Sequence, residues 1–154
     1  MQSERASDEH HGGPVPPVLE PAINLPPVIL WFGVAILAVH ATREWMLSPD
    51  MELRALLAFA FIPLRYTAGQ GGLPFPEAAW WSPFTYSLLH ADWFHAGVNL
   101  VWLAAFGTPV ARRLGASRTI LLAALASVGG AALHLAFFSG ELVPMVGASA
   151  VVSG

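Results

Sequence analysis

Three polar residues in apolar surroundings could form a serine-based catalytic site. His95 and Asn99 are four residues apart in an apolar run, and on a helix this spacing places both side chains on one face. Ser149 follows Gly147 and Ala148, where a further apolar helix begins. A serine hydroxyl can attack a carbonyl carbon, and nearby hydrogen-bond donors can stabilise the oxyanion that forms. Together these residues are suited to acyl transfer, with Ser149 as the nucleophile and His95 and Asn99 as oxyanion donors.

Each feature alone also has a structural explanation. A histidine and an asparagine on one helix face can make a polar contact between helices, and a serine at a helix start is more often an N-cap than a nucleophile. A metal site is not indicated, because His90 and His95 are five residues apart and no carboxylate lies in register with them. We therefore expect no metal and no cofactor.

The composition indicates a membrane protein. Hydrophobic residues make up 55% of the 154-residue chain and charged residues only 11%, whereas soluble domains carry about 25% charged residues. The net charge is −3 and the basic residues are scattered, so the sequence gives no sign of a basic surface that would bind nucleic acid. The absence of cysteine excludes disulfides and thiolate nucleophiles.

The elements that must position the polar residues are membrane helices. Apolar runs over about 27–47, 93–110 and 119–138 approach the roughly 20 residues that a helix needs to cross a bilayer. A fourth helix starts near Gly147. The fold class is therefore all-α: a polytopic membrane helix bundle, incomplete, with three spans and the start of a fourth. Residues 1–26 are polar and proline-rich and are predicted to form a disordered tail before a membrane domain over 27–154.

The long connection between the first two spans is expected to be partly embedded in the membrane. Within this loop, 48–83, the segment Met51–Ile62 is apolar enough for a helix but too short to cross, and Pro63 would end it. An interfacial helix fits better. Trp80 and Trp81 follow in a proline-rich stretch, and loops of this kind are typically functional.

The charge distribution predicts an orientation. Three arginines lie within Arg112–Arg118, and the positive-inside rule places such a short loop in the cytoplasm. The N-terminus is then cytoplasmic and the long loop outside, in a multi-pass protein of a bacterial inner or plasma membrane. Because two crossings separate them, Ser149 would enter its helix from the side on which His95 and Asn99 begin theirs. The three groups could then converge beneath the long loop.

At this point the sequence resembles the rhomboid intramembrane serine proteases, over about Trp81 to Gly154. His95-Ala96-Gly97-Val98-Asn99 is similar to the His-x-x-x-Asn motif at the start of the second core helix, and Leu89–His95 to the approach to it. Phe106-Gly107 followed by Arg113-Leu114-Gly115 resembles the turn between the second and third core helices. Gly147-Ala148-Ser149 resembles the Gly-x-Ser of the nucleophile.

The resemblance implies an activity and a role for each matching residue. Ser149 would be the nucleophile of a serine-type endopeptidase, its own N–H an oxyanion donor, and the side chains of His95 and Asn99 further donors. His90 would be a structural histidine that steadies the long loop. The general base of the family is a histidine on a later core helix. The partners would be transmembrane protein substrates, cleaved within the lipid bilayer.

Some features depart from the family pattern. Ala150 stands where glycine commonly follows the serine, and the tryptophan-arginine pair often found in the first loop is absent. His40 and His134 lie on other spans, where packed or interfacial roles suit them better than that of a base. We therefore expect a rhomboid truncated just after the nucleophile motif and inactive as written.

Two alternatives remain open at this stage. The chain could be a non-catalytic, rhomboid-like membrane protein that binds transmembrane clients. It could also be a fragment of a helical channel or transporter, although no span carries a paired acidic residue.

Overall fold

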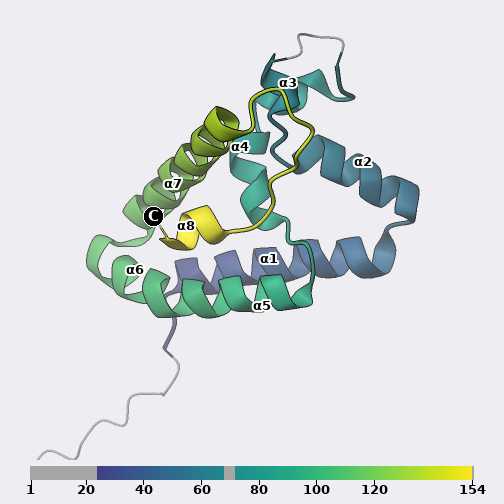
Figure 1. Cartoon of the computed structure of the whole chain (residues 1–154). Coiled ribbons are helices and arrows are strands. Elements are labelled where there is room, and N and C mark those ends of the chain that lie inside the picture. Colours follow the sequence, from purple (N-terminus) through teal and green to yellow (C-terminus); the bar gives the residue numbers. More distant parts are fainter. Residues whose placement is uncertain (1–23, 68–71, 154) are drawn as a thin grey trace, which may run out of the picture.

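The protein is all-α, as the apolar runs predict (Figure 1). The structure is a computed structural model, and it describes residues 24–67 and 72–153. Most of the expected disordered tail, residues 1–23, lies outside the described residues.

Three helices of the described chain are long and apolar enough to cross a membrane. The first is α1 (Pro27–Met46) and the last is α7 (Ala116–Phe137). The middle one covers Trp93–Leu114 and consists of α5 (Trp93–Trp102), the π-helical turn η4 (Leu103–Gly107) and α6 (Thr108–Leu114). It extends four residues beyond Val110, where we expected the second span to end. Many large apolar side chains on these helices are exposed, as lipid-facing side chains would be.

The wide turn η4 has a cause in the sequence that follows it. Pro109 lies inside the helical segment Trp93–Leu114, and a proline there lacks the N–H for the helical hydrogen bond and crowds the carbonyl of the residue four positions earlier. A π-helical turn immediately before Pro109 relieves this crowding without ending the helix. The segment ends at Gly115, whose φ of +79° suits glycine and allows the reversal into α7.

The long loop between α1 and α5 folds into short helices. These are α2 (Pro49–Phe59), α3 (Leu64–Thr67), η2 (Pro76–Ala79), α4 (Ser82–Thr85) and η3 (Tyr86–Leu88). We expected the first of them to continue to Ile62, but it stops at Phe59 because Phe61 instead forms an isolated antiparallel bridge with Met145.

Side chains from the rest of this loop bind the free carbonyl groups at the end of α2. A helix leaves its last four carbonyls without partners in the helix, so a buried helix end needs donors from elsewhere. Here they come from α3, from the turn before α4 and from α4 itself. The contacts are Arg65 to Leu57 and Ala60, Trp81 to Ala58 at 2.8 Å, and Thr85 to Phe59 at 2.8 Å.

The last helix, α8 (Ser149–Ser153), begins two residues after the predicted start near Gly147. It lies among the three long helices, and the extended segment before it passes α4 on the way (Figure 1). It packs on α7, α5, η3 and η4. The contact with α7 is close at Gly130, where an added Cβ would lie 2.5 Å from Cβ of Ala150 and 2.8 Å from the hydroxyl oxygen of Tyr86.

Gly130 and Gly129 provide a matched test of this packing. A methyl group at Gly129 would meet no atom within 4 Å, so Gly129→Ala should be neutral or slightly stabilising through helix propensity. Gly130→Ala should lower the free energy of unfolding by roughly 1–3 kcal/mol, because α8 or Tyr86 must move. Thermal unfolding of both variants in detergent micelles measures the difference. Equal melting temperatures would show that α8 does not pack against α7 as described.

Candidate active site

His95 and Asn99 lie on the first turns of α5, and Asp92 fixes where this helix begins. Oδ1 of Asp92 accepts a hydrogen bond from the backbone N–H of His95 at 2.7 Å, the geometry of an N-cap. The cap satisfies one of the N–H groups that the first turn of a helix leaves free. The bond from Asp92 to its backbone N–H therefore fixes His95 at the third position of the helix.

The Asn99 side chain is buried and bonded within the helix. Its Nδ2 donates to the carbonyl oxygen of His95, one turn earlier, at 2.9 Å. A side-chain amide carries two N–H groups, so this bond leaves one of them for another acceptor. The predicted common face of His95 and Asn99 is thus present, and the two residues are linked by a hydrogen bond.

The His95 ring packs directly on Gly147. A Cβ added at Gly147 would lie 2.8 Å from both Cε1 and Nε2 of this ring, closer than real Cβ atoms approach another atom. Gly147 also has φ of +114°, a conformation that side-chain-bearing residues rarely adopt. Glycine is therefore required here on two grounds, and its absent side chain brings the His95 ring to the backbone two residues before Ser149.

The segment before Ser149, Met145–Ala148, is held by hydrogen bonds to the long loop. We call it the approach segment. Its N–H groups find acceptors on three different parts of that loop, so its path is fixed at three points. The bonds are Met145 N to Phe61 O at 2.8 Å, Gly147 N to Tyr86 O at 3.0 Å, and Ala148 N to His90 Nε2 at 3.3 Å.

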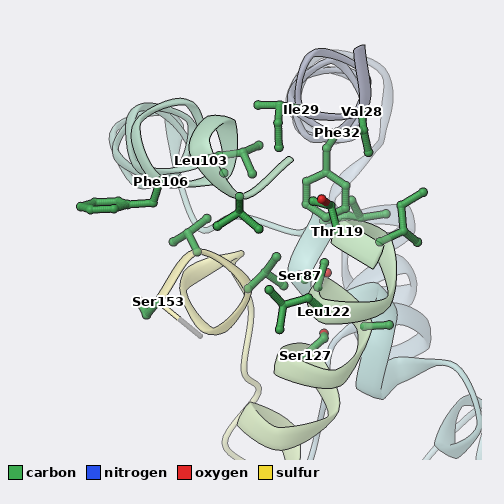
Figure 2. Close-up of a pocket in the computed structure, with 18 of the residues that line it drawn as sticks. Val28, Ile29, Phe32, Ser87, Leu103, Phe106, Thr119, Leu122, Ser127 and Ser153 are labelled. Carbon is green, nitrogen blue, oxygen red and sulfur yellow. The ribbon is translucent and has the colours of Figure 1, made fainter. Parts of the chain in front are cut away.

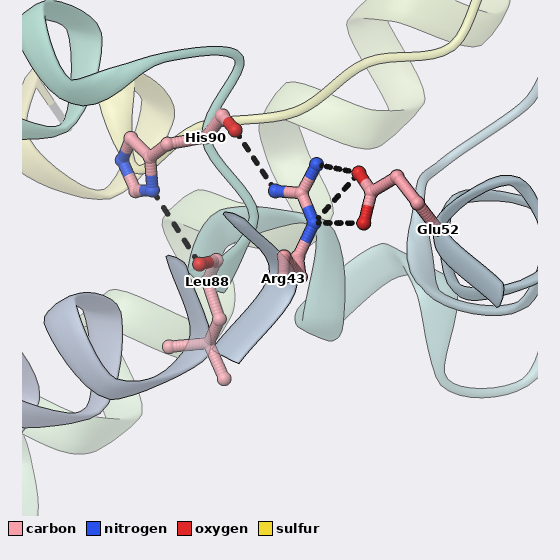
Figure 3. Close-up of polar contacts among 4 residues, drawn as sticks. All are labelled: Arg43, Glu52, Leu88 and His90. Carbon is pink, nitrogen blue, oxygen red and sulfur yellow. Dashed lines mark hydrogen bonds and ion pairs between the residues drawn. The ribbon is translucent and has the colours of Figure 1, made fainter. Parts of the chain in front are cut away.

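His90 is fully buried, and both nitrogens of its ring lie within hydrogen-bonding distance of backbone groups. Nε2 accepts the Ala148 N–H, so the proton of the neutral ring must sit on Nδ1, which lies 3.4 Å from the carbonyl oxygen of Leu88 (Figure 3). Burial, helped by the nearby His95 ring, lowers the pKa of His90 to about 4. His90 is therefore an acceptor for the Ala148 N–H at neutral pH.

Ser149 is the first residue of α8 and is exposed. The apolar cavity of about 570 Å³ beside α8 lies beyond it, at Val151, Val152 and Ser153, and opens toward α1, η4 and α7 (Figure 2). Among the described residues that line this cavity, none is titratable. The cavity is therefore suited to apolar chains and not to acid–base chemistry.

The two histidines on the other spans have packing contacts of their own. His40 is buried on α1, with its ring edge-on to Trp93 at 4.5 Å between centroids. His134 lies on α7, where Nε2 is 3.1 Å from the carbonyl oxygen of Val143. Within 24–67 and 72–153, no group of three or more histidine and acidic residues could hold a metal ion.

Sequence reasoning missed several residues that position the site. Asp92 could have been found, because aspartate directly before an apolar helical run is a typical N-cap. Arg43 and Glu52 could not: Arg43 donates to the carbonyl oxygen of His90, 47 positions away, and no sequence pattern indicates this contact. Nor does the sequence single out Tyr86, whose hydroxyl donates to the carbonyl oxygen of Ser127 on α7.

The neutral state of His90 predicts how stability depends on pH. Unfolding returns the pKa of this group from about 4 to about 6.5, so between these values the unfolded chain binds a proton that the folded chain does not. The free energy of unfolding should therefore fall as the pH drops from 6.5 to 4, by about 1.4 kcal/mol per pH unit for this group. Denaturation in detergent between pH 7.5 and 4 measures the slope.

His90→Gln keeps an acceptor but cannot titrate, so it should flatten the slope between pH 6.5 and 4. His134 is only partly buried, so His134→Gln is the control and should leave the slope unchanged. An unchanged slope in the His90 variant would contradict the assignment.

Comparison with known proteins identifies the domain that carries these residues. A sequence profile described as the Rhomboid domain matches residues 77–154, the C-terminal half of the chain, which contains Ser149, His95, Asn99 and His90. A search among curated proteins finds no match. On the strength of the domain match, the chain belongs to the rhomboid family.

Proposed function

We propose that the protein is an intramembrane serine endopeptidase that cleaves transmembrane segments of other membrane proteins. The observation that carries the proposal is the contact between the His95 ring and the backbone of Gly147, two residues before an exposed Ser149. It joins the two motifs, far apart in the sequence, that the chemistry requires. Membership of the rhomboid family, which includes serine proteases, supports the same reading.

In the proposed reaction, the Ser149 hydroxyl attacks the scissile carbonyl and forms a tetrahedral intermediate. The negative charge on its oxygen is stabilised by donors, for which we propose the His95 ring and the free N–H of Asn99. Collapse of the intermediate breaks the carbon–nitrogen bond, and the leaving nitrogen takes up the proton that came from the Ser149 hydroxyl and departs as the amine. Water then hydrolyses the acyl-serine and restores the hydroxyl.

The attack also needs a proton acceptor for the Ser149 hydroxyl. His90 is a poor candidate, since its Nε2 is occupied by the Ala148 N–H. In rhomboids that role belongs to a histidine on a later core helix. The tests of activity should use the protein expressed from its complete coding sequence.

The membrane setting supports a transmembrane substrate. The three long helices expose apolar side chains over most of their surface, and α8, which begins at Ser149, lies among them (Figure 1). A segment that already crosses the bilayer can reach such a site by lateral diffusion. The transmembrane clients of the non-catalytic alternative would arrive in the same way, so reactivity of Ser149 is the test.

A fluorophosphonate probe tests the nucleophile. The probe should label the protein covalently, and Ser149→Ala should abolish the labelling because the attacking oxygen is gone. Ser153→Ala changes another exposed serine one turn further along α8; it is the matched control and should label at the wild-type rate. Absence of labelling in the wild type would favour the non-catalytic alternative.

The proposed oxyanion donors make a second prediction. The phosphoryl oxygen of the probe would take the place of the oxyanion, so Asn99→Ala should lower the second-order rate constant of labelling roughly 100-fold. Val98→Ala changes an exposed neighbour on the same helix and should have little effect. Equal rate constants for the Asn99 variant and the wild type would show that Asn99 does not stabilise the oxyanion.

A further inference from the structure

Arg43, on the last turn of α1, joins three parts of the molecule. Only 8% of its surface is exposed. Its Nε lies 3.1 and 3.3 Å from the two carboxylate oxygens of Glu52 on α2, and its Nη2 also binds this carboxylate. Its Nη1 donates to the carbonyl oxygen of His90 at 2.8 Å. The guanidinium therefore holds a carboxylate on one side and a backbone carbonyl on the other (Figure 3).

This arrangement continues directly to the nucleophile. The residue whose carbonyl Arg43 holds is the one whose ring accepts the Ala148 N–H, next to Ser149. The path runs from Glu52 to Arg43, to the backbone and ring of His90, and to the approach segment. Each link between residues is a hydrogen bond, the step from the carbonyl of His90 to its ring is covalent, and the middle of the path is buried.

A fixed guanidinium is the group that such a link needs. The planar guanidinium can donate to a carboxylate and to a carbonyl at the same time. The ammonium group of lysine is a single point charge and could make only one of these two contacts in the same place. Glu52 is partly exposed, at 28%, and sits on the short helix α2. Glu52 therefore orients the buried arginine, and the arginine orients His90.

We propose that Arg43 and Glu52 are positioning residues for Ser149, acting through His90 and the Ala148 N–H. Neither residue touches the reacting atoms. The pair sets the place of the approach segment, and through it the distance between Ser149 and the donors on α5. The expected effect on catalysis rests on the proposed function, whereas the hydrogen-bonded path from Glu52 to Ala148 does not depend on it.

The amide of Ala148 gives a readout that does not depend on activity. Glycine precedes alanine at three places in the chain, so labelling with carbonyl-13C glycine and 15N alanine selects the amides of Ala116, Ala131 and Ala148. Arg43→Lys and Glu52→Gln should each shift the Ala148 resonance and speed its hydrogen exchange. The Ala116 and Ala131 resonances should stay in place and report that the fold is intact.

Glu44→Gln is the matched control. It removes the same charge from the exposed residue beside Arg43 and should leave all three resonances unchanged. An Ala148 resonance that does not move in the Arg43 and Glu52 variants would overturn the proposal.

Fluorophosphonate labelling then tests the consequence for Ser149. Arg43→Lys and Glu52→Gln should slow labelling about tenfold, the effect of one hydrogen bond to a charged group. In a His90→Phe background, Glu52→Gln should slow it no further, since the path is already broken. Additive effects in that background, or wild-type rates in both single variants, would show that the pair does not position Ser149 through His90. A wild type that does not label at all contradicts the proposed function instead, and the Ala148 resonance still decides the structural path.

Discussion

The structure depends on one requirement: the backbone N–H groups of a non-helical segment inside a membrane protein need hydrogen-bond acceptors. An unpaired N–H costs several kcal/mol in hydrocarbon, so irregular backbone packed among apolar helices is tolerated only where protein groups satisfy it. In the approach segment, Met145–Ala148, three N–H groups find such partners in Phe61, Tyr86 and His90. All three acceptors belong to the long loop, which therefore builds the surface on which the residue before Ser149 rests. The short helices of that loop, and the side chains that close the end of α2, follow from the same need.

Small residues then decide how closely the elements approach. Gly147 admits the His95 ring to the backbone, and Gly130 admits Ala150 and the Tyr86 hydroxyl to the surface of α7. These are contacts of backbone with side chain, and they are stiffer than contacts between flexible side chains. Ser149 is thus located between two surfaces that leave little room for adjustment. Ala150, which departs from the usual family pattern, is accommodated by the glycine that faces it.

Much of the fold could be predicted from the sequence, because length and apolar periodicity decide which segments can cross a bilayer. The all-α class, the three helices long enough to cross and the shared face of His95 and Asn99 follow from local rules. The path from Glu52 through Arg43 to His90 does not, since it joins residues nine and 47 positions apart through a backbone carbonyl that carries no sequence signal. The conformation of Gly147 was also beyond reach. The sequence identifies it only as the glycine of a Gly-x-Ser pattern, whereas the structure gives it a positive φ and a histidine ring as its neighbour.

The π-helical turn η4 has a geometric consequence for the second span. Leu103, Gly107 and Ala111 are spaced four residues apart, and on a regular α-helix such a spacing drifts by about 40° at each step. Yet Leu103 and Ala111 are both buried, and Gly107 lies against Ile29 of α1. The wider turn takes up part of the drift and keeps the three residues on the side that meets α1. The wider turn before the proline thereby keeps one line of contact with α1 from Leu103 to Ala111.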